Sequence, residues 1–138
     1  MRARKGLLLM LTARDIMSTQ VKTVTAQTPI LDLAQLLSER HISGAPVLSD
    51  DGALIGVATG ADILSKTGAT VGDIMTASVT SVAEDMPVPE IARLLGRLKI
   101  NRVPVMRGAA LIGIVSQGDI VRAIAYTDHP EAIIGKDA

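Results

Sequence analysis

The residues best suited to chemistry are a hydroxyl side chain and a carboxylate, three positions apart, that occur twice in the chain. Each pair follows a glycine and two apolar residues: Thr59 and Asp62 in the stretch 56–62, and Ser116 and Asp119 in the stretch 113–119. This spacing is typical of a capping box, so each stretch predicts a buried strand that runs directly into a helix. The first turn of a helix presents free N–H groups to a phosphate, and the carboxylate can accept hydrogen bonds from sugar hydroxyls.

A single hydroxyl-x-x-Asp pattern is more often a helix cap than a binding site. The duplication strengthens the binding interpretation because the surrounding residues repeat as well. Asp15-Ile16-Met17 recurs 58 positions later as Asp73-Ile74-Met75. The same spacing relates several further residues: Val24 to Val82, Pro29 to Pro87, Ala34 to Ala92, Ile42 to Ile100, and Pro46-Val47 to Pro104-Val105.

Each copy predicts the order strand, helix, strand, strand, helix. In the first copy we expect a strand at 21–24, a helix from Thr28-Pro29 to about Arg40, strands at 45–48 and 53–57, and a last helix from Thr59 to about Lys66. The fold class is therefore α+β, with two repeats that pack sheet against sheet around a pseudo-two-fold axis. The predicted organisation is an apolar arm (1–11), repeat one (12–66), a linker (67–72), repeat two (73–126) and a polar tail (127–138).

The composition argues against several classes of protein. The 138 residues include 14 basic and 14 acidic side chains, one Tyr and no Phe or Trp, so neither nucleic acid nor an anionic membrane is an expected partner. The absence of cysteine excludes disulfides and thiolate metal sites and fits a cytoplasmic location. His41 and His129 have no partner at a spacing that suits a metal or a nucleophile. We therefore expect no metal, no catalytic residue and no enzyme activity.

On these residues the chain resembles the tandem cystathionine β-synthase (CBS) domain pair, or Bateman module. Both Asp-Ile-Met openings, both Pro-Val strands and both glycine-to-aspartate stretches match, so the resemblance covers about residues 12–126. It implies a regulatory module that binds an adenosine nucleotide (AMP, ADP or ATP) in the cleft between the repeats. It also implies a homodimer that signals to a separate protein, and it implies no required cofactor.

The resemblance implies two binding sites, each drawing on both repeats. One would combine Ser116 and Asp119 with Val24, Ile42 and Ser43; its mirror would combine Thr59 and Asp62 with Val82, Ile100 and Asn101. In both, the aspartate would bind ribose and the hydroxyl would meet phosphate.

The two implied sites differ in charge. Arg102 stands two positions before Pro104, where relatives often place a phosphate-binding arginine, while the first copy has Gly44 there. We therefore predict that the site of Ser116, Asp119 and Arg102 is the tighter one, the alternative being that Arg102 is a solvated surface residue.

Two alternatives remain for the function. The chain could be a structural dimerisation module that binds no ligand, or its cleft could bind S-adenosylmethionine.

Overall fold

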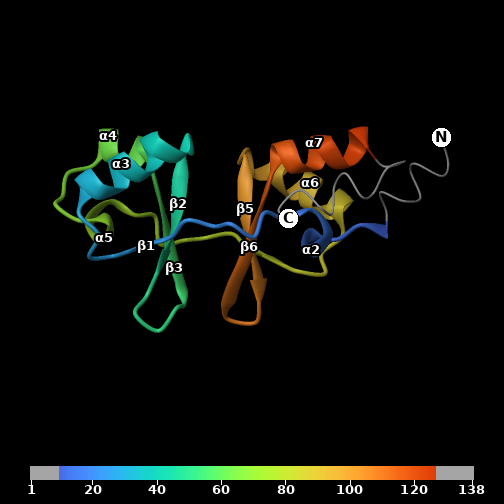
Figure 1. The fold of residues 1–138 in the computed structure, drawn as a ribbon, viewed down its shortest axis with the longest axis horizontal. Coiled ribbons are helices and arrows are strands. Elements are labelled where there is room, and N and C mark those ends of the chain that lie inside the picture. Colours follow the sequence, from blue (N-terminus) through green and yellow to red (C-terminus); the bar gives the residue numbers. More distant parts are fainter. Residues whose placement is uncertain (1–9, 127–138) are drawn as a thin grey trace. The chain divides into compact units, whose positions relative to one another are not determined.

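The computed structural model describes residues 10–126, so most of the predicted arm and the whole predicted tail lie outside the described residues. The helices are α2 (Ala13–Ile16), α3 (Ile30–Arg40), α4 (Gly60–Ser65), α5 (Val71–Ile74), α6 (Val88–Leu98) and α7 (Gln117–Ala125). The strands are β1 (Val24–Thr25), β2 (Gly44–Leu48), β3 (Leu54–Thr59), β4 (Val82–Ala83), β5 (Arg102–Arg107) and β6 (Ala110–Ser116) (Figure 1).

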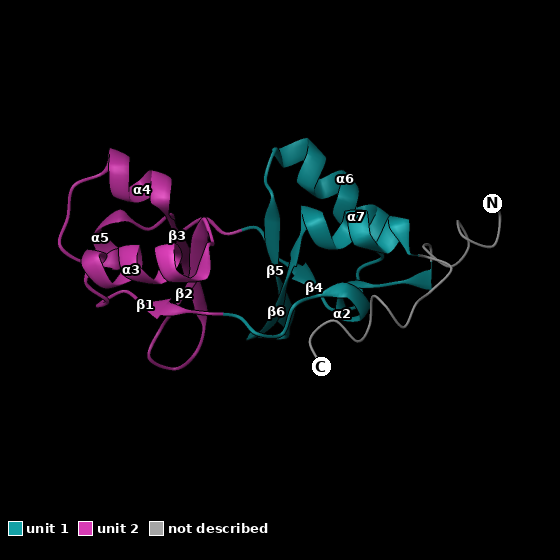
Figure 2. Ribbon diagram, turned by 45° about the horizontal axis from the view of Figure 1, so that its top comes forward, with its two compact units in different colours: residues 1–21, 80–138 teal, residues 22–79 magenta. Residues whose placement is uncertain are grey.

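The described residues form two compact units (Figure 2). Unit 2 consists of residues 22–79, and unit 1 consists, within the described range, of residues 10–21 and 80–126. Each contains a three-stranded sheet, in the order β1-β2-β3 or β4-β5-β6, whose first pair is parallel and whose second pair is antiparallel. The predicted α+β class is confirmed, while the predicted packing of one half on the other stays a prediction.

Each unit has its own apolar core on the helix-covered face of its sheet. The core of unit 2 is made of eight buried side chains: Val24, Leu33, Leu37, Ala45, Val47, Ala58, Val71 and Ile74. The core of unit 1 is built from the equivalent positions and is larger: Leu11, Ala13, Ile16, Val82, Val88, Ile91, Leu95, Val103, Val105, Val115, Ile120 and Ala123. Apolar residues at helical spacing on α3 and α6 contribute to the cores, and α2, α5 and α7 supply the remaining helical side chains.

The segment that opens each sequence repeat folds with the other repeat. The first opening segment, residues 11–18, lies in unit 1, and the second, residues 69–76, lies in unit 2. Both dock in the same way: Ser18 exchanges backbone hydrogen bonds of 2.8 and 3.0 Å with Ile114, and Thr76 exchanges two of 2.9 Å with Val57. The sequence repeats and the compact units therefore have different boundaries.

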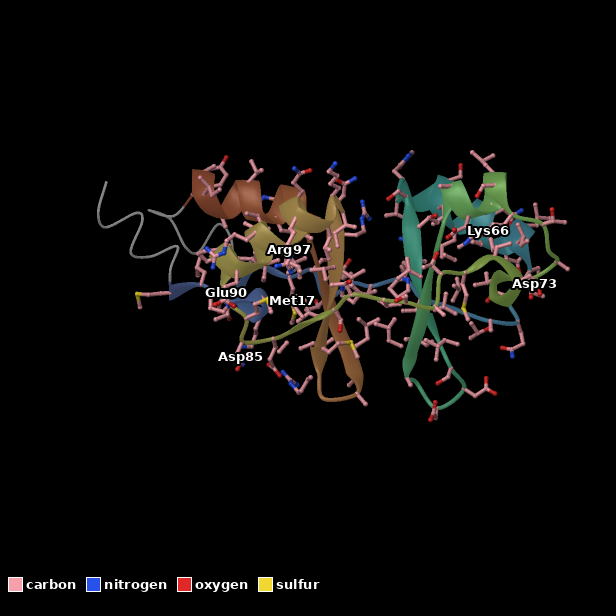
Figure 3. The ribbon with its side chains drawn as sticks, turned by 180° about the vertical axis from the view of Figure 1, so that it is seen from behind. Met17, Lys66, Asp73, Asp85, Glu90 and Arg97 are labelled. Carbon is pink, nitrogen blue, oxygen red and sulfur yellow. The ribbon has the colours of Figure 1, made fainter. Side chains whose placement is uncertain are left out.

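Glycines allow this docking. A Cβ added to Gly113 would lie 2.5 Å from the Met17 sulfur, and one added to Gly56 would lie 2.9 Å from the Met75 sulfur. Figure 3 labels Met17, which directly follows α2. The two glycines that precede the apolar residues of the repeated stretch are thus needed for close approach between segments.

Two local predictions differ from the structure. The strand expected at 21–24 is only Val24–Thr25, because β1 pairs with β2 at just these two positions. The helix expected to start at Thr28 has Pro29 at its N-cap instead, and the Thr28 hydroxyl accepts a hydrogen bond of 3.0 Å from the Thr25 N–H. The hydroxyl therefore closes the preceding turn and leaves the helix uncapped by a side chain.

Candidate functional site

The repeated stretches form the predicted capping boxes. In unit 2 the Thr59 hydroxyl accepts from the Asp62 N–H at 3.1 Å, and the Asp62 Oδ2 accepts from the Thr59 N–H at 2.9 Å. In unit 1 the Ser116 hydroxyl accepts from the Asp119 N–H at 3.2 Å, and the Asp119 Oδ2 accepts from the Ser116 N–H at 2.8 Å. The strand-to-helix geometry expected at both stretches is confirmed.

The capping box alone does not mark a ligand site. The opening segments carry the same box, with Thr12 and Asp15 before α2 and Thr70 and Asp73 before α5. What distinguishes Asp62 and Asp119 is burial, since they are 7 % and 8 % exposed and are the buried charged residues among the described ones. Buried carboxylates require partners for both oxygens.

A basic residue one turn along the helix faces the second oxygen of each buried aspartate. Lys66 Nζ lies 3.0 Å from Asp62 Oδ1 and also donates to the Ile74 carbonyl at 3.1 Å. Arg122 Nη1 lies 3.6 Å from Asp119 Oδ1. The separation in this helical ion pair is therefore shorter in unit 2 than in unit 1.

The environment of Asp62 favours its charged form. Burial alone would raise the pKa of this carboxyl, but hydrogen bonds from Lys66 and Thr59 outweigh burial and hold the pKa below its ordinary value of 3.8. Asp62 is therefore ionised at neutral pH.

The strand beside each cap presents a different residue to it. Gly44 of β2 is directly opposite Thr59, and Arg102 of β5 is directly opposite Ser116. The Nε of Arg102 is buried and has no hydrogen-bond partner within the part of the chain that the structure describes. A buried guanidinium nitrogen without a partner is costly, so this atom is suited to an anionic ligand.

The turn before each of these strands also reaches the cap. The Ser43 carbonyl accepts from the Gly60 N–H at 3.0 Å, and the Asn101 carbonyl accepts from the Gln117 N–H at 2.7 Å. Ser43 thus lies beside the Thr59 cap, and Asn101 lies beside the Ser116 cap. The predicted combinations, Ser116 with Ser43 and Thr59 with Asn101, join residues of different units and stay predictions.

The four predicted apolar ligand residues lie at the cores. Val24 and Val82 are buried in the cores of units 2 and 1. Ile42 and Ile100 are half-buried and pack against the same cores.

A groove of about 460 Å³ lies between α6 and α7. It is lined by Ala92, Leu95, Gly96, Lys99, Ile100, Asn101, Gln117, Ile120 and Val121. Ser116, Asp119 and Arg102 are not among its lining residues, but Asn101 and Gln117 are, so the groove adjoins the Ser116 cap without including its side chains.

Sequence reasoning missed the two basic residues at the caps, Lys66 and Arg122. The spacing of Lys66 four positions after Asp62, and of Arg122 three positions after Asp119, is a signal for helical ion pairs that could have identified both cations. Gly44 was identified from the sequence as the uncharged counterpart of Arg102, but its place opposite Thr59 is revealed only by the strand register.

Among residues 10–126 no three or more His, Asp or Glu side chains gather as they would around a metal ion. In the same range no helix has both the length and the apolar character needed to cross a membrane.

Comparison with known proteins identifies the family. The CBS domain matches twice, at residues 13–67 and 71–126. The chain is 32 % identical over 121 residues to hypoxic response protein 1 of Mycobacterium tuberculosis, covering 82 % of this chain and 85 % of that protein.

Two solved structures show the same fold. CBSX2 of Arabidopsis thaliana, solved in complex with AMP, has a TM-score of 0.80 at 32 % identity, covering 86 % of this chain and 98 % of that one. The CBS domain pair of protein MJ0100, in complex with 5′-methylthioadenosine and S-adenosyl-L-methionine, has a TM-score of 0.77 at 30 % identity, covering 84 % and 97 %. With both sequence repeats matched and the fold shared along most of its length, this chain belongs to the CBS domain family.

Proposed function

We propose that this chain is a regulatory module that binds an adenosine ligand, with the phosphate of a nucleotide held in unit 1 at the start of α7. The observation that carries the proposal is the buried, unpartnered Nε of Arg102 on the strand position opposite Ser116. An arginine–phosphate contact is charge-assisted and is worth about 1.5–3 kcal/mol when shielded from water. The AMP bound by CBSX2 supports this ligand class.

Asp119 is the proposed acceptor for the ribose hydroxyls. Its Oδ2 is used by the helix cap, while its Oδ1 faces Arg122 at 3.6 Å, beyond ordinary hydrogen-bond length. We propose the same order of affinity as the sequence predicts, with the Ser116, Asp119 and Arg102 site tighter than the Thr59 and Asp62 site. The support is the residue opposite each cap, which is Arg102 in unit 1 and the uncharged Gly44 in unit 2.

The proposed role is regulation of a separate protein by a homodimer. Exposed apolar side chains on and beside α6 and α7 supply a surface for self-association: Leu98, Val121, Ile124 and Tyr126. Burying several of them would contribute roughly 1.5–3 kcal/mol each. Light scattering at micromolar concentration measures this directly, and a monomer would contradict it.

S-adenosylmethionine is the second candidate ligand, because the MJ0100 domain pair binds it. Its sulfonium and amino groups are positive, so Arg102 would disfavour it in unit 1. Calorimetric titration with AMP, ADP, ATP, adenosine and S-adenosylmethionine ranks the candidate ligands. If none of them binds, the alternative function, a structural dimerisation module without a ligand, would be favoured.

The decisive variant is Asp119→Asn, with Asp73→Asn as its matched control. Both remove the carboxylate of a capping box and should cost about 1 kcal/mol of unfolding free energy. Only Asp119→Asn should also weaken AMP binding, by roughly tenfold or more, since it removes a charged acceptor for the ribose. Equal AMP affinity in the two variants would assign Asp119 to capping alone.

A further inference from the structure

The residue at the N-cap of the last helix and the residue opposite it on the neighbouring strand both differ between the two units. Gly44 faces Thr59 in unit 2, and Arg102 faces Ser116 in unit 1. A Cβ added to Gly44 would lie 2.9 Å from the Thr59 γ-methyl, closer than unbonded carbon atoms approach one another. The methyl group on the neighbouring strand is thus the tightest obstacle to a side chain at position 44, followed by the Ala58 carbonyl oxygen at 3.2 Å.

The Thr59 methyl cannot turn away without loss of the cap. The Thr59 hydroxyl accepts from the Asp62 N–H at 3.1 Å and donates to Asp62 Oδ2 at 3.0 Å, which fixes the side-chain torsion and therefore the place of the methyl. Threonine has few torsional alternatives because its β-carbon is branched. The conformation of the Thr59 cap and the absence of a side chain at position 44 are therefore coupled.

Ser116 makes the same cap without a methyl. Its backbone angles (φ −107°, ψ 164°) are close to those of Thr59 (φ −122°, ψ 166°), and its hydroxyl accepts from the Asp119 N–H at 3.2 Å. Ser116 therefore has no methyl group to place against the strand residue opposite it, which is Arg102.

We infer that the identity of the cap residue, serine or threonine, determines which unit can carry a phosphate-binding arginine. Ser116 is then a specificity-determining residue: it admits Arg102 and makes unit 1 the unit for anionic adenosine ligands. This inference rests on the proposed function for its ligand. The charge balance supports it, since unit 2 has three basic and six acidic residues, whereas the described part of unit 1 has seven and five.

The steric coupling is tested without any ligand, by thermal melts of Gly44→Arg, Thr59→Ser and the double variant. Gly44→Arg should lower the melting temperature by roughly 3 °C or more, because the new Cβ overlaps the methyl. Adding Thr59→Ser should recover most of that loss, since serine keeps the cap and removes the methyl. Strictly additive shifts, with no recovery in the double variant, would overturn the coupling.

The specificity is tested by Ser116→Thr in the full chain, with AMP and adenosine as probes. The added methyl should displace Arg102, so the ratio of AMP affinity to adenosine affinity should fall about tenfold, because Arg102 meets only the phosphate. In an Arg102→Ala background the same substitution should not reduce AMP affinity further. An unchanged ratio of AMP to adenosine affinity would overturn the specificity role.

The two tests separate the inference from the proposed function. If the wild-type chain binds neither AMP nor adenosine, the proposed function and the specificity role both fail. The melts of the Gly44 and Thr59 variants still decide the coupling in that case.

Discussion

Units 1 and 2 share a backbone plan but differ at the cap that begins the last helix. The paired strands, the docked opening segment and the capping box are the same in both, down to hydrogen bonds that agree within a few tenths of an ångström. The residue opposite the cap hydroxyl differs, with an arginine in unit 1 and a glycine in unit 2. The common features hold the fold together, and the chemistry is concentrated where the units differ.

A second difference lies where the opening segments meet the sheets. In unit 1 Glu84 binds Arg107 at 2.7 Å and Arg14 of α2 at 3.0 Å. In unit 2 the equivalent residues are Gly72 of α5 and Ala26, which carry no charge and are joined by a backbone hydrogen bond of 2.8 Å from the Gly72 N–H to the Ala26 carbonyl. An ion pair therefore accompanies this docking in unit 1, and the equivalent residues of unit 2 form none.

The largest expected effect is on stability, from two substitutions that each destabilise one unit. Ile16 and Ile74 hold equivalent places in the opening segments and are 1 % and 0 % exposed. Ile16→Ala and Ile74→Ala should each cost about 2–5 kcal/mol of unfolding free energy. Hydrogen exchange should show the loss of protection in β5 and β6 for Ile16→Ala, and in β2 and β3 for Ile74→Ala. Loss of protection in β2 and β3 from the Ile16 variant would contradict the exchanged opening segments.

The next effect tests the close approach at the strand glycines. Gly113→Ala and Gly56→Ala should each cost about 1–3 kcal/mol, because the new Cβ would lie 2.9 Å from the carbonyl oxygen of Ser18 or Thr76. Gly96→Ala is the matched control, since nothing lies within 4 Å of its added Cβ and it is inside α6. That control should stabilise by up to about 1 kcal/mol. Chemical denaturation measures all three, and a harmless Gly113→Ala would contradict the contact.

A smaller effect is expected on how the folding stability changes with pH. Hydrogen bonds from Arg107, opposed by burial and helped by Arg14, hold the pKa of Glu84 below its ordinary value of 4.5. A lowered folded-state pKa gives stability that is present above pH 4.5 and is lost as the pH falls below it. Glu84→Gln should therefore show a shallower decline of stability in acid than the wild type, whereas Asp85→Asn, an exposed neighbour, should not. If the stability of all three proteins fell equally with decreasing pH, Glu84 would not be a source of the acid sensitivity.

The smallest effect compares the two helical ion pairs. Lys66→Met should cost at most about 1 kcal/mol, because the pair is partly exposed. Arg122→Met should cost less, since its separation from Asp119 is 3.6 Å. In the Lys66 variant the pKa of Asp62 should rise, because the strongest hydrogen bond that opposes its burial is lost. Carboxyl shifts in an NMR titration measure this, and an unmoved Asp62 would rule out Lys66 as its main partner.

Local patterns predicted more of this protein than non-local ones. The caps at Thr59 and Ser116 were predictable because a hydroxyl and an acid three residues apart act within one helical turn. The resemblance also placed Arg102 in one site with Ser116 and Asp119. That Arg102 is directly opposite Ser116, and Gly44 directly opposite Thr59, depends on the pairing of two strands and is seen only in the structure. The sequence also did not predict that residues 11–18 pack in unit 1 rather than in unit 2. The repeat pattern would be the same whichever unit this segment joined.

The exchanged opening segments have a consequence for synthesis on the ribosome. The contact between Val57 and Thr76 closes 19 residues of chain, whereas the one between Ser18 and Ile114 closes 96, at an extra entropic cost of about 1.4 kcal/mol. Unit 2 has all its residues once residue 79 has emerged, whereas the first opening segment emerges before unit 2 and finds its partner strand only after it. A chain arrested when residue 100 has just emerged from the ribosome should therefore hold a folded unit 2 and a first opening segment whose Leu11 and Ile16 are not yet buried in a core.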